Sequence, residues 1–519
     1  MESATPLVAA APAASPSSNL TTKHIRGSSL LLAGRLLSMA AGFAVQVLTV
    51  RYLSKSDYGA FAYALSVVSL GTSFVLLGLD KTITRFVPIY HEQHDYNRLF
   101  GAILMMVGAV VTLGLALILG LYAFQGWLGQ ALVKDHLSLT LLLIVIALAA
   151  VRALDELLVG LFAIFANPRA IFFRRYLLAP GLELLVVVLL ILAHSDVFFL
   201  AGGYMAAGVF GIVLYLWILM RALRQQGLFQ HFNLRTITLP VREVFSFSLP
   251  LLASDFVFVL RSSLVVVLLE YFQSTTDVAA FRAVLPVARL NMVVLQSFTF
   301  LFMPLASRMF ARKEWQGIND LYWQSATWIA MISFPVFLVT FSLAQPLTVL
   351  LFGERYADSA MILALLALGY YFNAALGFNG LTLRVFGKVR YLFVADLIMA
   401  AATLGVNLAL IPRYGALGAA IGTCGTLIAQ NLVYQIGLGF GTSISLFHWR
   451  SFKVYLLIIA GAAGVFLVQL LLSPPLYVAF GLATLASLAA IGVNRQSLKV
   501  KETFPEVLRF PLARWIFGG

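Results

Sequence analysis

Residues 34–90 read GRLLSMAAGFAVQVLTVRYLSKSDYGAFAYALSVVSLGTSFVLLGLDKTITRFVPIY. Two long apolar runs, near 28–50 and 58–79, lie on either side of a short turn that carries Arg51 and Lys55. One helical crossing of a bilayer needs about 20 apolar residues. This stretch therefore predicts two membrane-spanning helices joined by a short polar turn.

The rest of the chain has the same character. Of its 519 residues, 61% are hydrophobic and only 11% are charged, and the mean hydropathy is +0.94. Soluble domains are about 45–50% apolar and about 25% charged, so this chain has too few polar residues to cover a soluble surface. Inside a bilayer the protein must satisfy its own backbone polar groups, and long uninterrupted apolar runs indicate helices and not a β-barrel. We therefore predict an all-α polytopic membrane protein.

Charged residues and Gly, Pro or Asn clusters divide the chain into about fourteen expected transmembrane helices. These spans are 28–50, 58–79, 99–124, 138–165, 171–193, 197–220, 246–270, 279–306, 322–344, 359–383, 391–411, 415–438, 454–473 and 475–493. Because the number of spans is even, both termini are expected on the same side of the membrane.

The 35 Lys and Arg residues test this division independently, because cytoplasmic loops carry an excess of them. The turns after odd-numbered spans hold only Arg51, Lys55, Lys134, Arg355 and Arg413. The spans themselves hold Arg35, Arg152, Arg261, Arg282 and Arg289. The other 25, among them Arg174 and Arg175, are assigned to the termini and to the turns after even-numbered spans. Both termini are therefore expected in the cytoplasm.

A short repeat divides the first twelve spans into two halves. Residues 57–61, DYGAF, follow the first span, and residues 277–281, DVAAF, follow the seventh span 220 positions later. Each half then has six spans, so the halves have the same orientation and are related by a pseudo-twofold axis along the membrane normal. The expected parts are an N-lobe over 28–223, a cytoplasmic linker over 224–245, a C-lobe over 246–438, two extra C-terminal helices over 452–493, and tails over 1–27 and 494–519.

The two tails and the net charge are interpreted through this topology. Residues 1–27 are expected to form a disordered cytoplasmic tail, because they lack the basic start and apolar core of a secretory signal. Residues 494–519 mix basic and aromatic side chains, which suits either an interfacial membrane anchor or a solvated cytoplasmic tail. The net charge of +14 mostly reflects topology, so we expect anionic lipids as partners and no nucleic acid.

The sequence offers little for catalysis. It has no P-loop, no Gly-rich dinucleotide-binding turn and no Cys/His spacing for a metal, and its single Cys424 lies in an apolar run. The turns on the predicted outer side are short and leave no room for an extramembrane catalytic domain. We therefore expect a transporter and not an enzyme, with no metal and no organic cofactor.

Two stretches carry a resemblance to a known family. Residues 34–90 contain RYL and DYGAF between the first two helices, and then GLD followed by TRFVP. Residues 387–423 read GKVRYLFVADLIMAAATLGVNLALIPRYGALGAAIGT. Both stretches resemble bacterial oligosaccharide flippases, the polysaccharide-transporter branch of the multidrug/oligosaccharidyl-lipid/polysaccharide (MOP) exporter superfamily.

The resemblance implies a function. Such proteins move a polyprenyl-pyrophosphate-linked oligosaccharide from the cytoplasmic to the outer leaflet by alternating access between two lobes. This implies a multi-pass flippase of the plasma (inner) membrane that serves exopolysaccharide, O-antigen or capsule synthesis, with polysaccharide assembly proteins as further partners. The resemblance covers about 28–438, and the last two helices go beyond the twelve-helix members of the family.

Two other classes of protein remain open. A cation-coupled drug or metabolite exporter of the same superfamily is the main alternative, although members of that branch resemble one another in an acidic residue within the first helix, where this chain has Arg35. A membrane glycosyltransferase, polymerase or ligase would need carboxylates in a sizeable outer loop, which this sequence lacks.

Basic residues within the spans are the first candidates for a binding site, because charges in a membrane are costly and usually face a partner or a wet cavity. Arg261, Arg282 and Arg289 belong to the hairpin of spans 7 and 8, and Arg282 and Arg289 share a helical face. Guanidinium groups match the oxygens of a pyrophosphate well, so these three and Arg35 are predicted to bind the substrate's pyrophosphate headgroup. Glu270 in the same hairpin is an alternative partner that would neutralise one of them.

The repeat also predicts a contact between the lobes. The two copies of the repeat are 220 residues apart, and the same shift takes Arg35 to Asp255. Positions that correspond in the two halves face each other across a twofold axis. The two side chains are expected to form a gating pair that breaks when the cavity opens, or else static contacts on separate helices.

Acidic residues within the spans are candidates for coupling transport to H⁺ or Na⁺. Asp155 and Glu156 lie three and four residues after Arg152, so they are expected either to pair with it on one helix or to leave one carboxylate for a cation. Glu183 has no local partner in the sequence and is either a coupling carboxylate or a neutral structural residue.

Further candidates lie at the ends of spans 2 and 10 and within span 10. A cytoplasmic entrance for the anionic headgroup is predicted at Lys81, Arg85, Arg384, Lys388 and Arg390, although topology alone also explains these charges. Polar and aromatic residues of span 10 either line a sugar cavity or pack in the core; they are Tyr370, Tyr371, Phe372, Asn373, Phe378 and Asn379.

Overall fold

The computed structural model describes residues 16–131, 133–165, 171–233 and 235–494. Within these ranges all regular structure is helical, and eleven helices are long and apolar enough to cross a membrane. The predicted all-α membrane fold is therefore confirmed, whereas the number of fourteen crossings stays a prediction. The tails over 1–15 and 495–519 lie outside the described residues.

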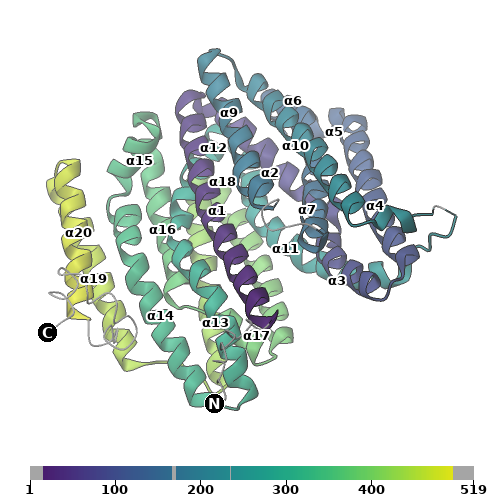
Figure 1. The fold of residues 1–519 in the computed structure, drawn as a ribbon. Helices are drawn as coiled ribbons and strands as arrows, with labels where there is room; N and C mark the ends of the chain where they lie inside the picture. Colours follow the sequence, from purple (N-terminus) through teal and green to yellow (C-terminus); the bar gives the residue numbers. More distant parts are fainter. Residues whose placement is uncertain (1–15, 132, 166–170, 234, 495–519) are drawn as a thin grey trace, which may run out of the picture.

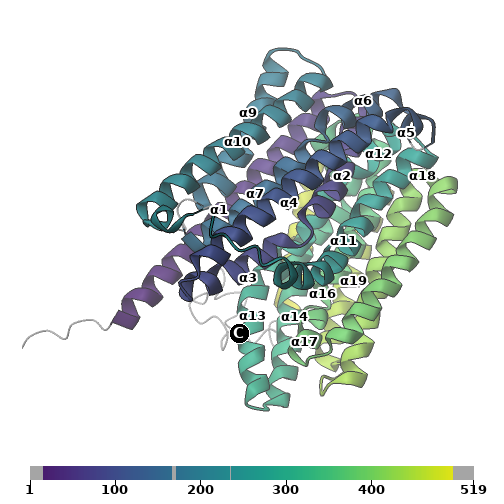
Figure 2. The ribbon, with the colours of Figure 1, turned by 90° about the vertical axis from the view of Figure 1, so that its right-hand side faces the viewer.

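The first half of the chain forms a bundle that corresponds to the predicted N-lobe (Figures 1 and 2). Its elements are α1 (Pro16–Tyr52), α2 (Lys55–Leu76), α3 (Leu79–Glu92), α4 (Tyr96–Ala123), α5 (Gln125–Ala131), α6 (His136–Val145), α7 (Leu148–Phe165), the π-helix η1 (Phe172–Leu178), α9 (Ala179–Leu192) and α10 (Val197–Gln225). Helix α1 begins at Pro16, inside the segment predicted to be a disordered tail.

A short 3₁₀-helix, η2 (Leu228–His231), lies in the predicted linker and leads into the second half. The elements of the C-lobe are α11 (Val241–Phe272), α12 (Thr275–Arg289), η3 (Leu290–Met292), α13 (Val293–Ala311), α14 (Trp315–Phe337), the π-helix η4 (Leu338–Ser342), α15 (Ala344–Phe352), η5 (Glu354–Ser359), α16 (Ala360–Ala375), α17 (Asn379–Val385) and α18 (Val389–Gly441).

Helix α18 is two antiparallel helices and not one long rod. At Gly415 the backbone has φ 55° and ψ −134°, which is not helical. A hydrogen bond of 2.7 Å from the side chain of Gln430, after Gly415, to Asp396, before Gly415, shows that the chain reverses at this glycine. A side chain at Gly415 would come within 2.6 Å of the Asp277 carboxylate, so glycine fits here for space as well as for its positive φ. This reversal separates the predicted spans 391–411 and 415–438.

The predicted repeat is visible in matching helix N-termini. Ser54 caps α2 by accepting a hydrogen bond of 3.0 Å from the backbone N–H of Asp57, and its hydroxyl donates to the Asp57 carboxylate at 2.7 Å. Ser274 caps α12 in the same way, with distances of 3.3 and 2.8 Å to Asp277. Such caps satisfy backbone N–H groups that a helix leaves free at its start. The two halves therefore begin their second span with the same local structure.

Helices α2 and α12 cross closely where the two lobes meet. A Cβ atom on Gly59 of α2 would overlap the backbone carbonyl of Thr275, so only glycine allows this approach. The hydroxyls of Ser56 and Thr275 lie 3.0 Å apart beside it. We call the side of the molecule at which α1 ends and α2 begins the distal side; the positive-inside rule predicts it to be the outer side.

Two further helices, α19 (Trp449–Leu472) and α20 (Leu476–Val493), follow the C-lobe. They lie at one edge of the molecule, against α14 (Figure 1). The Tyr455 hydroxyl donates to the Ala375 carbonyl at 2.7 Å, and the Ser342 hydroxyl donates to the Ala462 carbonyl at 2.9 Å. The extra pair is therefore docked onto the C-lobe and not onto the N-lobe.

Candidate functional site

A central cavity of about 360 Å³ lies beside α12 in the C-lobe. It is lined by Val265, Phe281, Leu285, Arg289, Met292, Gln296, Tyr370, Asn373, Thr403, Thr423, Thr426 and Leu427. Arg289 is exposed, and its Nε–H donates a hydrogen bond of 3.1 Å to the Tyr370 hydroxyl. Its guanidinium carbon lies 5.8 Å from the centre of the Tyr370 ring. Neither terminal nitrogen of Arg289 donates a hydrogen bond to a residue that the structure describes, which leaves both for a ligand in the cavity.

Arg35 reaches this cavity's wall from the other lobe. Its Nη2 donates a hydrogen bond of 2.8 Å to the Gln296 side-chain oxygen, which joins α1 to α13. Among the described residues, the hydrogen-bond partners of Arg35 and Arg289 are therefore an amide and a phenol, neither of which neutralises a positive charge. No acidic residue is among the described residues that line the cavity.

The structure describes the other two arginines predicted to bind the pyrophosphate, Arg261 and Arg282, less completely. Arg282 is half-buried on α12, and its electrostatic neighbours include Arg289 and Tyr370. The side chains of Arg261 and Asp255 lie outside the described residues, so the Arg35–Asp255 gating pair stays a prediction.

The alternative that Glu270 neutralises one of these arginines stays a prediction, because the side chain of Arg261 lies outside the described residues. Glu270 is buried at the distal end of α11 and lies against Asp135 and Ser138 of the N-lobe. It reaches this position because α11 ends beside the turn that precedes α6.

The residues of span 10 divide between the two expected roles. Tyr370 and Asn373 line the cavity. Tyr371 and Phe378 are buried in the core, where the Tyr371 hydroxyl donates to the Ala330 carbonyl at 2.9 Å. Asn379 is also buried and donates to the Asn431 side chain at 3.0 Å. Two of these residues therefore line a cavity and three pack in the core, Phe372 is half-buried, and the binding of sugars there stays a prediction.

Sequence reasoning missed several polar residues of this cavity. Thr403, Thr423 and Thr426 come from the two halves of α18 and meet only because the chain reverses at Gly415. Single threonines are common in transmembrane helices, so nothing in the sequence distinguishes these three. The offset of 220 gives a partial signal, because it maps the candidate Glu183 onto Thr403.

A second cavity of about 180 Å³ lies within the N-lobe. It is lined by Leu148, Val151, Arg152, Asp155, Arg174, Ala179, Leu182, Glu183, Tyr204, Ala207 and Gly208. Arg174 donates to Asp155 at 2.6 Å, and Arg175 lies 3.5 Å from Glu156. The carboxylates of α7 thus pair with the neighbouring η1 and not with Arg152 on their own helix.

This pairing corrects the assignment of Arg174 and Arg175 to a cytoplasmic turn. Both residues lie in η1, which continues directly into α9. Arg174 is buried, and its guanidinium carbon lies 5.0 Å from the centre of the Tyr215 ring. A side chain on Gly211 would come within 2.6 Å of Arg174, so glycine leaves the space for it. Basic residues near the end of a span are typical of a loop, and the hydropathy of the sequence does not reveal that Arg174 has a partner, Asp155, inside the protein.

Arg152 and Glu183 face the same N-lobe cavity, and each is among the other's electrostatic neighbours. Among the residues that the structure describes, they form no direct ion pair. The expected coupling role of Glu183, Asp155 and Glu156 stays a prediction, now with Arg152 and Arg174 as the groups that surround Glu183.

The buried ion pair allows a stability prediction. Arg174→Leu is expected to lower the free energy of unfolding by about 3–5 kcal/mol, because it leaves the Asp155 carboxylate unpaired in the membrane interior. The double variant Arg174→Leu/Asp155→Leu should recover most of this loss, since replacing both partners by apolar groups is often close to neutral. Thermal unfolding of the purified protein in one detergent measures both.

Arg175→Leu is the matched control, because Arg175 and Glu156 are both 44% exposed and such pairs contribute little. An effect of Arg175→Leu as large as that of Arg174→Leu would contradict the assignment of the Arg174 pair as the stabilising one.

The predicted entrance residues are all exposed. Lys81 and Arg85 lie on α3, Arg384 on α17, Lys388 directly before α18 and Arg390 in its first turn. Arg85 lies over the ring of Phe247 in α11, at 4.3 Å, which is a contact with the C-lobe. The role of these residues in gathering a headgroup stays a prediction.

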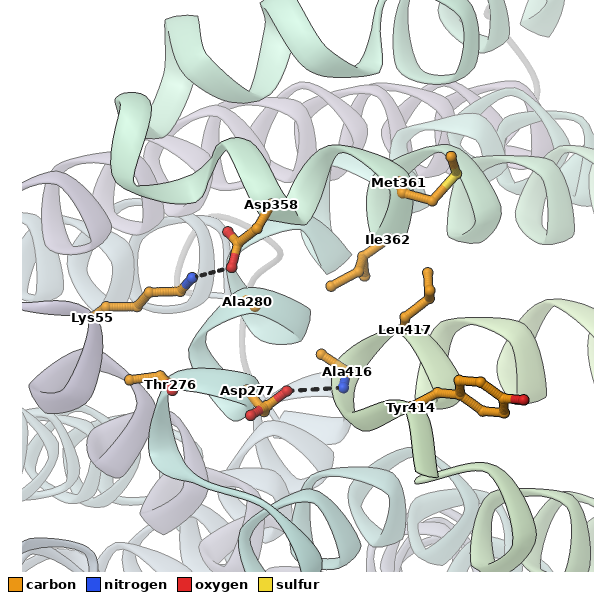
Figure 3. A pocket seen from close by; sticks show the side chains of 10 residues that line it. All are labelled: Lys55, Thr276, Asp277, Ala280, Asp358, Met361, Ile362, Tyr414, Ala416 and Leu417. Atoms are coloured by element: carbon orange, nitrogen blue, oxygen red, sulfur yellow. Dashed lines mark hydrogen bonds and ion pairs between the residues drawn. The ribbon is translucent and has the colours of Figure 1, made fainter. Parts of the chain in front are cut away.

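A third cavity of about 250 Å³ lies on the distal side, between the lobes (Figure 3). Its lining includes Lys55 from the N-lobe, and Asp277, Asp358, Tyr414 and Ala416 from the C-lobe. Lys55 and Asp358 form an ion pair of 2.5 Å across the interface, and Asp277 accepts a hydrogen bond of 3.0 Å from the Ala416 backbone N–H. Sequence reasoning counted Lys55 only as an outer-side charge and did not single out Asp358.

The two-lobed helical architecture is the fold of solved structures from the MOP exporter superfamily. A structure described as lipid II flippase MurJ in an inward closed conformation matches 91% of this chain and 99% of its own, with a TM-score of 0.68 and 15% identity. An inward-facing multidrug resistance MATE family transporter of the MOP superfamily matches 76% of this chain and 92% of its own, with a TM-score of 0.63 and 13% identity.

The sequence itself identifies the family. Residues 24–310, more than half of the chain, match the family described as polysaccharide biosynthesis protein, so the chain belongs to this family. An uncharacterized membrane protein of Methanocaldococcus jannaschii is 22% identical over 425 residues, which are 77% of this chain and 81% of that protein. The predicted resemblance to the polysaccharide-transporter branch is confirmed.

Proposed function

We propose that the protein is a flippase that carries a polyprenyl-pyrophosphate-linked oligosaccharide from the cytoplasmic to the outer leaflet by alternating access, for surface polysaccharide synthesis. The proposal places it in the plasma (inner) membrane with both termini in the cytoplasm. Anionic lipids and polysaccharide assembly proteins are its proposed partners.

The observation that carries this proposal is the charge of the central cavity. Arg289 and Arg35 are oriented by Tyr370 and Gln296, which are neutral, so no hydrogen-bond partner among the described residues offsets their positive charges. Guanidinium groups bind phosphate oxygens through paired hydrogen bonds. The hydroxyl and amide groups of the cavity suit the hydrogen-bonding groups of a sugar. An anionic headgroup with sugars attached therefore fits this lining better than an apolar cation does.

The alternative of a cation-coupled drug exporter is less well supported. A cationic drug would need a carboxylate or an electron-rich cage at its binding site. The described lining of the central cavity supplies an arginine instead of a carboxylate, and the described acidic pair of α7 is matched by Arg174 and Arg175.

Deleting the gene in its host tests the proposal. We expect finished lipid-linked oligosaccharide to accumulate in the inner leaflet and surface polysaccharide to be lost, with both effects reversed by the wild-type gene. Unchanged polysaccharide together with altered sensitivity to cationic drugs would reject the flippase and support the exporter.

A further inference from the structure

We propose that four basic residues of the distal side form a clamp that holds the two lobes together there and must release before this side opens. The residues are Arg51, Lys55 and Lys134 of the N-lobe and Arg355 of the C-lobe, and we call them the distal clamp. The inference rests on the alternating access in the proposed function, but it does not depend on the identity of the substrate.

The first part of the clamp is a reciprocal contact between helix ends. Arg51 at the end of α1 donates hydrogen bonds to the carbonyls of Leu350 and Leu351, at 2.5 and 2.8 Å, in the last turn of α15. Arg355 donates to the carbonyls of Val50 and Arg51, at 2.6 and 2.5 Å, in the last turn of α1. The last carbonyls of a helix have no partner within it and carry the negative end of its dipole. Each lobe therefore supplies the cation that caps a helix of the other lobe.

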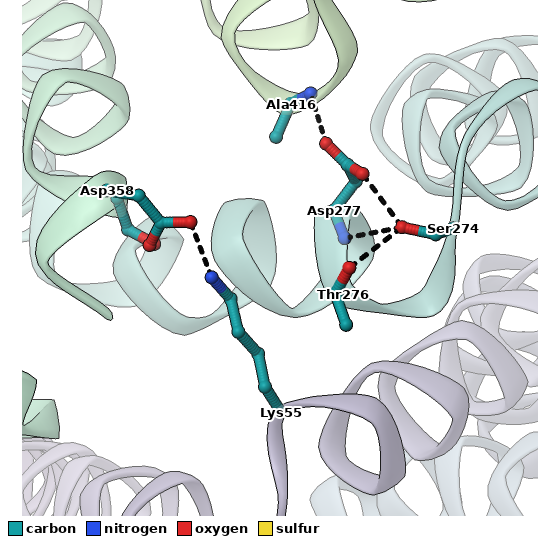
Figure 4. Close-up of polar contacts among 7 residues, drawn as sticks. Lys55, Ser274, Thr276, Asp277, Asp358 and Ala416 are labelled. Carbon is teal, nitrogen blue, oxygen red and sulfur yellow. Dashed lines mark hydrogen bonds and ion pairs between the residues drawn. The ribbon is translucent and has the colours of Figure 1, made fainter. Parts of the chain in front are cut away.

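The second part is the ion pair between Lys55 and Asp358 (Figure 4). Lys55 is the first residue of α2, and Asp358 belongs to η5, the same element that carries Arg355. The Lys55 side chain is 20% exposed and lies 5.4 Å from the centre of the Tyr356 ring. Two adjacent elements of the N-lobe thus contact one short element of the C-lobe.

The third part lies at the far end of the same interface. Lys134, in the turn before α6, lies 5.2 Å from the centre of the Tyr271 ring at the end of α11. The neighbouring Glu270 lies against Asp135, in the same turn, and Ser138, in the first turn of α6. The clamp therefore contacts both α11 and the α15–η5 segment of the C-lobe.

The distribution of basic residues in the sequence supports a role for the four residues of the distal clamp. The turns after odd-numbered spans carry only five basic residues, which the positive-inside rule disfavours on an outer side. Four of the five contact the opposite lobe. The fifth, Arg413, is exposed and makes no hydrogen bond or ion pair with any residue that the structure describes. The basic residues retained on this side are thus almost all used at the lobe interface.

Helix α12 connects the clamp on the distal side to the central cavity. Helix α12 begins at Thr275, beside the clamp, and ends at Arg289 in the cavity. Separation of the lobes at the distal side would break every contact of the clamp at once, after which water would solvate the released carbonyls and charges. The set therefore favours the closed distal side without making its opening prohibitive.

Distance measurements between the lobes test the clamp. Spin labels are placed at two exposed positions, His194→Cys in a distal turn of the N-lobe and Ser473→Cys between α19 and α20, which are docked onto the C-lobe. The background is Cys424→Ala, and the protein is in lipid nanodiscs without substrate. We expect one short-distance population for the otherwise wild-type chain. The double variant Lys55→Ala/Arg355→Ala should increase the ratio of the longer-distance to the short-distance population at least tenfold, while Arg413→Ala should leave it unchanged.

A charge exchange keeps the test decisive if the alanine variant unfolds. Lys55→Asp alone should open the distal side, and Lys55→Asp/Asp358→Lys should restore the short distance, since it rebuilds the ion pair with reversed sign. Unchanged distances in folded Lys55→Ala/Arg355→Ala, or an equal effect of Arg413→Ala, would overturn the clamp. Because no substrate is present, a failure of the proposed flippase function would leave these distances unaffected.

Discussion

Arg289→Ala is expected to reduce flipping of a polyprenyl-pyrophosphate-linked oligosaccharide by about tenfold to a hundredfold. In the structure, the Nε–H of Arg289 is held by the Tyr370 hydroxyl, which leaves its terminal nitrogens for the cavity. A hydrogen bond to a charged group contributes about 1.5–3 kcal/mol, and each 1.4 kcal/mol corresponds to about a factor of ten. The measurement is the rate at which the lipid-linked oligosaccharide becomes accessible in the outer leaflet of proteoliposomes with defined protein orientation.

Three further variants show whether the effect comes from recognition of phosphate. Arg289→Lys keeps the charge but loses the fork of donors, so it should retain part of the activity. Tyr370→Phe removes the partner that orients Arg289 and should have a smaller effect than Arg289→Ala. Arg308→Ala removes an exposed cation from α13 outside the cavity lining and should leave the rate unchanged. Wild-type flipping by Arg289→Ala would show that the headgroup binds elsewhere.

Much of the fold can be predicted from the sequence, because the bilayer imposes a length and a composition on each span. The repeat of DYGAF in DVAAF predicted two halves, and the structure shows why those residues recur: each Asp completes the capping of a helix by the serine three positions before it. The interruption at Gly415 was also predictable, since Pro412 and Gly415 lie together between two apolar runs.

Less of the candidate site could be predicted from the sequence, because its geometry depends on contacts between spans. Charge alone pointed to Arg35 and Arg289, and both contribute to the central cavity or its wall. Their partners, Gln296 and Tyr370, lie on different helices and have no fixed sequence separation from the arginines. Arg174 was missed for the opposite reason: a basic residue near a span end resembles a loop charge until its buried partner, Asp155, is known.

The second prediction concerns the energy source. Glu183→Gln is expected to abolish the stimulation of flipping by a pH gradient while leaving a slower, potential-driven rate. Glu183 shares the N-lobe cavity with Arg152 and Arg174. A Na⁺ ion needs several oxygen ligands, and the other carboxylate of this cavity, Asp155, is paired with Arg174, whereas a proton needs only the Glu183 carboxylate itself. We therefore expect a proton and not Na⁺ to be the coupling ion at Glu183.

The residual rate has a physical basis that separates coupling from binding. Outward movement of two negative charges across a membrane that is negative inside gains about 4.6 kcal/mol per 100 mV, so the anionic headgroup can move without a coupled ion. Flipping by wild-type protein in proteoliposomes should rise with an imposed pH gradient and respond little to a Na⁺ gradient. In Glu183→Gln the rate should depend on the membrane potential alone, and Glu156→Gln, whose carboxylate pairs with an exposed arginine, should retain the pH response. An intact pH response in Glu183→Gln would place coupling at another residue, because a glutamine at this position cannot take up and release the proton.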